Sequence, residues 1–203
     1  MLLSLGTQAN PRYDTPIAPG GLGLVHRLLN TAPAGRPQAA DLLESVASAQ
    51  EWLDAAVAEW GQAAPALEVT AEDLRGLRAL RDAVRAALLA RGDGAAEGAA
   101  RLHATADVWL SGDGSIGAAP RGRTAAQWLR SAVLVECFVA EVSGTWPRLK
   151  ICANPRCPVA FYDRSRNRSG VWHDVHVCGN AINLRASRAR RRGRRGAAAT
   201  PAD

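Results

Sequence analysis

The sequence predicts an α+β fold that is mostly α-helical, with a helical N-terminal domain, one short β-hairpin, and a small C-terminal module rich in cysteine and arginine. Three observations predict it. Apolar residues recur at spacings of three and four over 38–61 and 70–91, which is typical of amphipathic helices. Apolar and more polar residues alternate over 101–110, the period of a β-strand. Three of the four cysteines lie between 152 and 178.

Two amphipathic helices are expected in the first half of the chain. The first covers 38–61, and Gly61 and Pro65 end it. The second begins at Thr70, which resembles an N-cap because the acid Asp73 follows three residues later, and it ends at the glycine-containing break at 92–94. The apolar stripes are Leu42, Val46, Ala49, Leu53, Ala56 and Trp60 in the first helix, and Leu74, Leu77, Leu80, Val84 and Leu88 in the second.

A hairpin and a third helix follow. Residues 101–110 predict a strand with one buried face, and the turn at 112–114 leads into its hairpin partner. A third helix is expected from Thr124 to about Val142, and Gly144 and Pro147 close it. The buried strand face consists of Leu102, Ala104, Ala106, Val108 and Leu110.

The helical domain contains no recognisable catalytic constellation, so we expect a protein that is not an enzyme. Its histidines, His26 and His103, are isolated along the sequence, and His103 is expected at the surface. Four tryptophans either pack in the core, which we favour, or enclose a small apolar effector that the sequence does not identify. They are Trp52, Trp60, Trp109 and Trp128.

The charge of the chain is strongly asymmetric. Residues 145–203 contain 13 Arg or Lys against 3 acids, a net charge of +10, whereas residues 1–144 contain 12 against 16, a net charge of −4. The C-terminal module is therefore the candidate for a polyanionic partner. No run of eighteen apolar residues and no signal peptide is present, so we expect a cytoplasmic protein with no membrane partner.

Two ligand pairs predict a metal site in that module. Cys152 and Cys157 are separated by four residues, and His173 and Cys178 repeat that gap. Three sulfurs and one nitrogen make a tetrahedral set typical of zinc, so we predict one structural Zn²⁺ in a zinc-knuckle module. His176 is the alternative nitrogen ligand, but only one residue separates it from Cys178. Four protein ligands leave no open position for catalysis.

Other interpretations of the same residues remain open. The cysteines and histidines are also compatible with free thiols beside surface histidines, or with a disulfide between Cys152 and Cys157. Cys137 lies alone on the apolar face of the third helix, which favours a packed core cysteine.

The metal-ligand region also resembles a known protein family. Cys152 to Cys157, the segment 161–167, Trp172, and Cys178-Gly179-Asn180 followed by an arginine-rich helix together resemble the CGNR zinc-finger family over 148–192. The preceding region, with the helix at 74–81, resembles the ABATE domain that often accompanies it. This resemblance implies a zinc-containing, stress-linked, DNA-binding transcription regulator. The chain departs from the family pattern at His173, where a cysteine is usual, at Gly170-Val171, where two arginines are usual, and at Ala181, where the final arginine of the motif is usual.

The predicted domains are an ABATE-like domain over 1–144, the zinc finger over 145–192, and a disordered tail over 193–203. We expect DNA to be the partner and the location to be the cytoplasm, in association with the nucleoid. An acidic protein bound by an adaptor, or an RNA, is the alternative partner, and a homodimer is possible. The residues expected to contact nucleic acid are Arg164, Arg166, Arg168, Asn183, Arg185, Arg188, Arg190, Arg191 and Arg192.

Overall fold

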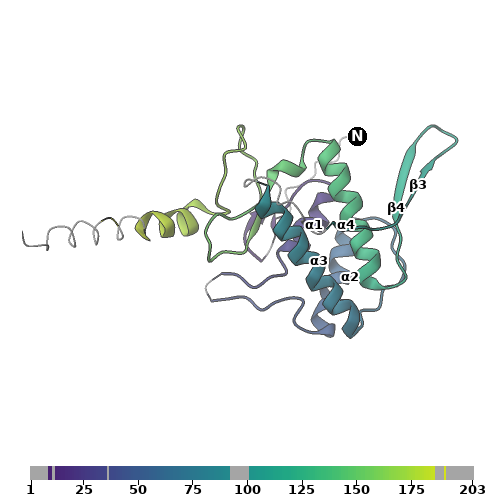
Figure 1. The fold of residues 1–203 in the computed structure, drawn as a ribbon, viewed down its shortest axis with the longest axis horizontal. Coiled ribbons are helices and arrows are strands. Elements are labelled where there is room, and N and C mark those ends of the chain that lie inside the picture. Colours follow the sequence, from purple (N-terminus) through teal and green to yellow (C-terminus); the bar gives the residue numbers. More distant parts are fainter. Residues whose placement is uncertain (1–8, 11, 36, 92–100, 186–189, 191–203) are drawn as a thin grey trace, which may run out of the picture.

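The computed structural model describes residues 9–10, 12–35, 37–91, 101–185 and 190. Within them, four α-helices pack into a body, and short antiparallel strand pairs lie around it (Figure 1). The mostly α-helical α+β class predicted from the sequence is confirmed. The helices are α1 (Leu22–Leu29), α2 (Val46–Trp60), α3 (Ala71–Ala90) and α4 (Ala125–Val142). The strand pairs are β1 (Ala9–Asn10) with β2 (Thr15–Pro16), β3 (Ala106–Leu110) with β4 (Ile116–Pro120), and β5 (Leu149–Ile151) with β6 (Ala160–Tyr162).

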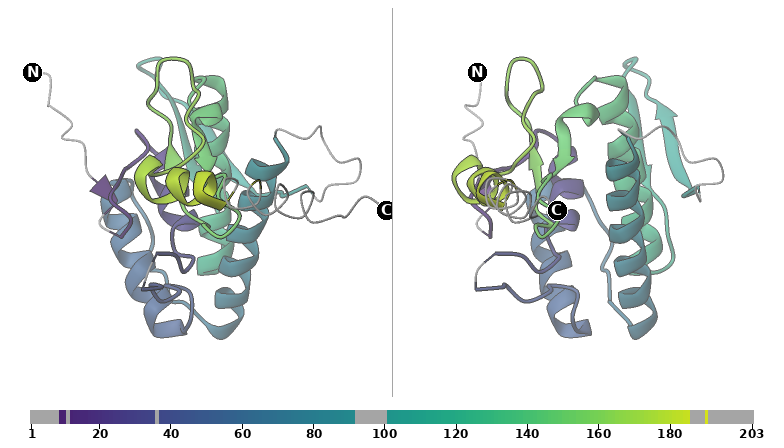
Figure 2. Two further views of the ribbon diagram at one scale, coloured as in Figure 1. Left: turned by 90° about the vertical axis from the view of Figure 1, so that its left-hand side faces the viewer. Right: turned by 60° about the vertical axis from the view of Figure 1, so that its left-hand side comes forward.

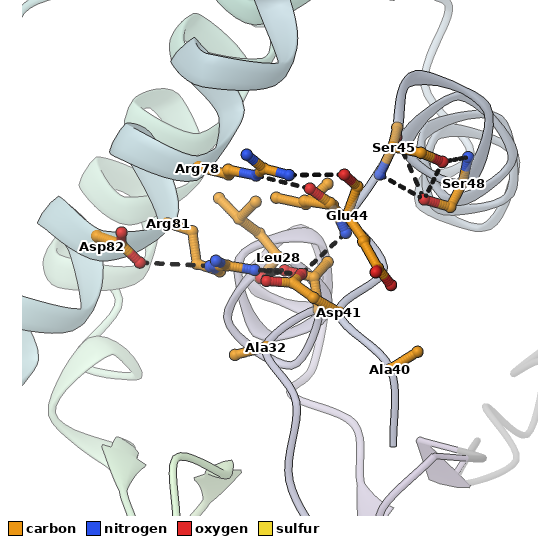
Figure 3. Close-up of polar contacts among 12 residues, drawn as sticks. Leu28, Ala32, Ala40, Asp41, Glu44, Ser45, Ser48, Arg78, Arg81 and Asp82 are labelled. Atoms are coloured by element: carbon orange, nitrogen blue, oxygen red, sulfur yellow. Dashed lines mark hydrogen bonds and ion pairs between the residues drawn. The ribbon is translucent and has the colours of Figure 1, made fainter. Parts of the chain in front are cut away.

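Helix α2 begins at Val46 and not at residue 38, so the predicted start was wrong. Ser45 and Ser48 form a capping box that fixes the first turn. The preceding segment is held by α3 instead: Arg81 donates to the Asp41 carboxylate at 2.6 Å, and Arg78 donates to the Leu43 carbonyl at 2.7 Å (Figure 3). These tertiary contacts stabilise an irregular segment whose apolar residues mimic a helical stripe.

Helix α3 begins where the sequence predicted. Thr70 and Asp73 form the capping box, and Asp73 also accepts a hydrogen bond from the Ala126 backbone N–H at 2.9 Å. Burial opposes ionisation of Asp73, but hydrogen bonds from Thr124 and Ala126 lower its pKa to about 2. One carboxylate therefore ties the starts of α3 and α4 together.

Helix α1 was not predicted. Seven of its eight residues are buried, including Leu24, Val25 and Leu28, and the helix has only about two turns, so few residues are available to mark a helical period. It lies in the middle of the body, in contact with each of the other three helices. A helix buried on all sides cannot be distinguished by periodicity from a buried strand.

The hairpin β3–β4 forms, but its predicted buried face does not. The strands pair from Ala106 with Pro120 to Leu110 with Ile116, around a turn that Gly114 permits with a φ of +83°. Val108 is 71% exposed and Leu110 is 72% exposed. The hairpin projects from the body on the side opposite the C-terminal helical segment (Figure 1), so its outer part has no layer to pack against.

The body core contains the tryptophan pair Trp60 and Trp128, which pack edge to face with ring centroids 5.7 Å apart. Trp60 Nε1 also donates to Glu136 at 2.8 Å. Trp52 is buried as well, whereas Trp109 lies on the exposed hairpin. The tryptophans of the body are therefore packed. No helix among the described residues is long and apolar enough to cross a membrane.

Candidate metal centre

The hairpin β5–β6 positions the first two thiols. Cys152 follows β5, and its N–H donates to the Val159 carbonyl at 2.9 Å. The chain then turns back, because the Cys157 N–H donates to the Asn154 carbonyl at 2.8 Å. The same hairpin contributes Leu149 and Ala160 to the core of the helical body. The loop that carries Cys152 and Cys157 is thus anchored at its base by apolar packing.

Two buried polar residues of the body, which no sequence pattern indicated, also hold this hairpin. The Ala18 N–H donates to His26 Nδ1 at 3.2 Å, which leaves Nε2 to donate to the Ala160 carbonyl at 2.9 Å. The Asn30 side chain binds both backbone groups of Ala160: its Nδ2 donates to the carbonyl at 3.1 Å, and its Oδ1 accepts from the N–H at 2.8 Å. Burial lowers the pKa of His26 to about 4, so it is neutral near pH 7. His26, which is isolated in the sequence, is part of this contact in the fold.

The second ligand pair comes from the segment that opens the C-terminal helix. The Asp174 side chain accepts from the Val177 N–H at 2.9 Å and caps a π-helical turn, η2 (Val175–Gly179). Cys178 therefore lies inside this turn, and the helix that the sequence predicted after this residue begins at Asn180. Gly179 allows the turn to approach Trp172, because a Cβ there would lie 3.2 Å from the ring.

Cys152, Cys157, His173 and Cys178 converge on one point. Their ligand atoms all lie within 4.8 Å of one another. His173 Nδ1 is 3.4 Å from Cys157 Sγ and 3.7 Å from Cys178 Sγ. A tetrahedral zinc with Zn–S of about 2.3 Å and Zn–N of about 2.0 Å requires ligand separations of roughly 3.5–3.8 Å. The cluster fits one structural zinc ion, whereas His176 is exposed and outside it.

The thiols of this cluster do not titrate alike. A hydrogen bond from Cys157 and another from His173 lower the pKa of Cys152 to about 3. The shared proton and burial raise the pKa of Cys157, and burial raises that of Cys178. Cys152 and Cys157 thus share a proton, and binding of a cation displaces the protons that remain on the thiols.

Asn154 is a site residue that ligand spacing did not reveal. Its side chain is buried, and its Nδ2 donates to Cys178 Sγ at 3.3 Å. Its Oδ1 accepts from the Arg156 N–H at 3.2 Å and from Arg185 Nη1 at 3.4 Å. Asn154 therefore orients a metal ligand and connects the ligand loop to the C-terminal helix. Its place between Cys152 and Cys157 is the only sequence signal.

The arginine loop, residues 164–168, is held by the base of the hairpin. Asp163 is buried and accepts from Lys150 Nζ at 2.7 Å and from the Gly170 N–H at 2.8 Å. Burial opposes ionisation, but hydrogen bonds from Lys150 and Ser165 hold the pKa of Asp163 well below its usual range. The arginine side chains themselves are exposed: Arg164, Arg166 and Arg168.

The helical segment that follows η2 is described at 180–185 and at 190. Asn183 and Arg190 are exposed on it. Arg185 is half-buried and donates to Asn154 Oδ1, so it supports the residue that orients Cys178. Figure 2 shows this segment on one side of the molecule, away from β3–β4. Arg188, Arg191 and Arg192, which were also predicted to contact nucleic acid, lie outside the described residues.

The sequence of this module matches a known family of zinc fingers. Residues 148–191 match the CGNR zinc finger. The match begins at η1 (Trp146–Arg148) and contains every residue of the metal cluster. No curated protein matches the chain. The ABATE-like assignment of residues 1–144 and the boundary at residue 144 remain predictions.

The structure gives physical reasons for two residues of this module. His173 supplies Nδ1 as the fourth donor of the cluster. A Cβ at Gly170 would lie 2.9 Å from the buried Asp163 carboxylate, so the backbone approaches this side chain closely only because residue 170 is glycine.

Proposed function

We propose that the protein is a DNA-binding transcription regulator whose CGNR zinc finger contacts the duplex. The observation that carries this proposal is the arrangement of cationic side chains around the metal cluster. The arginine loop follows the first ligand pair, and the C-terminal helical segment follows the second. Both segments therefore extend from the metal cluster, and each carries exposed arginine.

The charge of the region supports a polyanionic partner. The segment 145–203 has a net charge of +10. Arginine neutralises phosphates and also makes bidentate contacts to guanine in the major groove. Asn183, exposed on the helical segment, has the donor and acceptor needed for an adenine edge. We assign phosphate contacts to the arginine loop, and base contacts to the helical segment with Asn183 and Arg190.

The proposed role of the zinc is structural. Three sulfurs and one nitrogen complete its coordination, so no position remains for a bound water. We therefore propose that the protein is not an enzyme and that the metal fixes the loop and the helical segment relative to each other.

The test compares binding to a 20-base-pair duplex and to a single-stranded RNA of equal length across a salt series. Replacing Arg164 and Arg166 by Gln should weaken duplex binding and flatten the plot of log K against log salt by about two units, close to 0.9 per lost phosphate contact. A matched control replaces Arg75 and Arg101 on the helical body. Equal effects of the two double variants, or tighter binding of RNA, would contradict the proposal.

A second candidate, an adaptor for an acidic protein, is favoured by one observation. Val175, Val177 and Leu184 are more than half exposed beside the metal cluster. Phosphate recognition does not need this apolar strip. Replacing Val177 by Ser should leave DNA affinity unchanged if the zinc finger binds DNA through its arginines. Absence of any duplex affinity in the wild type, with zinc bound, would favour the adaptor.

A further inference from the structure

A basic hollow lies on the helical body, although residues 1–144 carry a net charge of −4. The hollow measures about 680 Å³ and lies between the first turns of α4 and the two segments that lead into and out of the β3–β4 hairpin. Four of its eight lining residues are basic, and among the described residues no carboxylate lines it. The basic residues are His103, Arg121, Arg123 and Arg130.

The backbone beside the hollow is fixed closely against α4. A Cβ at Gly122 would lie 2.2 Å from the Trp128 backbone nitrogen, so only glycine permits this approach. On one side the Arg121 N–H donates to Ser131 Oγ at 3.1 Å. On the other the Arg123 N–H donates to Gln127 Oε1 at 3.1 Å. The backbone of Arg121 and Arg123, on either side of Gly122, is therefore fixed before any ligand binds.

Arg130 has a buried donor without a partner. Its Nε is inaccessible to water and makes no hydrogen bond within the described chain. Elsewhere on the body, Arg78, Arg85 and Arg91 donate to backbone carbonyls, and Arg81 donates to Asp41. Buried polar atoms in folded proteins are normally hydrogen-bonded. The Nε of Arg130 is thus an exception among these arginines, and the residue lines the basic hollow.

The end of α4 does not account for this cluster, and no ion pair within the described chain neutralises Arg123 or Arg130, although an adjoining hollow that both also line contains Glu68, Glu72 and Asp73. The first N–H groups of α4 are already occupied, since Ala126 donates to Asp73 and Gln127 donates to Thr124. Arg121 forms an ion pair with Asp107, but no such pair is formed by Arg123 or Arg130 among the described residues. Two guanidinium groups therefore remain available to an anion.

We propose that this hollow binds a small phosphate-bearing molecule, with Arg123 and Arg130 donating to its phosphate oxygens. A phosphate group presents three acceptor oxygens and up to two negative charges, enough for two planar guanidinium groups, whereas a carboxylate is satisfied by one. The volume leaves room for an attached organic group. This site is separate from the zinc finger and adds a ligand-binding activity to the proposed DNA-binding function.

Calorimetric titration of the full-length zinc-loaded protein with pyrophosphate tests the proposal. We expect saturable binding at one site per chain. Arg130→Gln and Arg123→Gln should each weaken it by about tenfold or more, because each removes a charge-assisted hydrogen bond. Arg101→Gln removes an exposed arginine of the same domain that does not line the hollow, and it should bind like the wild type.

Several outcomes would overturn the assignment. Absence of saturable binding at millimolar pyrophosphate, or an unchanged affinity of Arg130→Gln, would remove the site. Loss of binding in the Arg164 and Arg166 double variant would place the anion on the zinc finger. Tighter binding of succinate than of pyrophosphate would contradict the phosphate chemistry. The DNA measurements use a different set of arginines, so failure of one proposal is distinguishable from failure of the other.

Discussion

The helical body and the CGNR zinc finger are stabilised by different means. The body buries an extensive apolar core. Among the described residues beyond 144, only Leu149 and Ala160 are buried members of the same cluster, and Trp146, Ile151 and Tyr162 pack against it. The zinc finger instead relies on its ligand set and on buried polar residues such as Asn154 and Asp163. Metal binding can therefore be as large a part of the folding free energy of this module as apolar burial is for the body.

The two regions are nevertheless joined. Side chains from α1 and α3 reach the β5–β6 hairpin, where His26 and Asn30 contact Ala160 and Arg85 donates to the Pro158 carbonyl at 2.6 Å. The base of the zinc finger is thus held by contacts with the body, whereas its ligand-bearing loops depend on metal coordination. A substitution that destabilises one region should therefore leave the structure of the other region intact beyond the β5–β6 hairpin.

The largest effect is expected from His173→Ala, which removes one of the four ligands. Structural zinc sites bind with apparent free energies of about 10–16 kcal/mol, so zinc content should fall from about one per chain to nearly none. Far-UV circular dichroism should still show a folded helical body. His176→Ala is the matched control and should retain zinc. Full zinc retention by His173→Ala would exclude His173 as a ligand.

A core truncation tests the other half of the comparison. Leu129 is fully buried in α4, and Leu129→Ala should lower the free energy of unfolding by about 2–5 kcal/mol through lost burial and a cavity. Zinc content at pH 7 should not change. Denaturant titration gives the stability, and Leu110→Ala, at an exposed position of the hairpin, should change it by less than about 0.5 kcal/mol. Loss of zinc in the folded Leu129→Ala protein would show that the regions are not separable.

The contact between the regions should respond to acid. The pKa of His26 is lowered from 6.5 to about 4 in the folded protein, so the unfolded chain binds more protons between these values. Stability should fall as the pH drops from 6.5 towards 4, by at most about 3 kcal/mol from this group, and should level off below pH 4.

Denaturant titrations of the wild type and His26→Gln at several pH values isolate this contribution. The slope of stability against pH should be smaller in His26→Gln, since the variant lacks the titrating group. Parallel slopes for wild type and His26→Gln would show that His26 does not sense the pH at this contact.

The smallest effect is expected at the residue that supports a ligand. Asn154→Ala removes the hydrogen bond to Cys178 Sγ, and zinc affinity should fall by about 10- to 100-fold while the site still fills at excess metal. Competition with a chelator measures this change. Asn167→Ala, on the exposed arginine loop, serves as the control and should match the wild type. Equal affinities of the two variants would assign Asn154 a role in folding alone.

Prediction from sequence succeeded where the signal is local. Helix α3, the end of α2 at Gly61 and the hairpin turn at Gly114 follow from capping residues and from glycine conformation. It failed for α1, which is too short for a helical period to repeat, and for the start of α2, where Arg78 and Arg81 hold an irregular segment in place. It also assigned a buried face to β3, because alternation does not reveal whether another layer covers a strand.

The sequence by itself determined the residue types of the metal site and the concentration of positive charge around it, because ligand chemistry and charge are properties of the residues. Only the tertiary structure decided that His173 and not His176 points into the cluster, that Asn154 and Asp163 hold its loops, and that His26 contacts Ala160. These contacts join residues up to 134 positions apart. Their formation depends on how the helices pack, which no local pattern along the chain encodes.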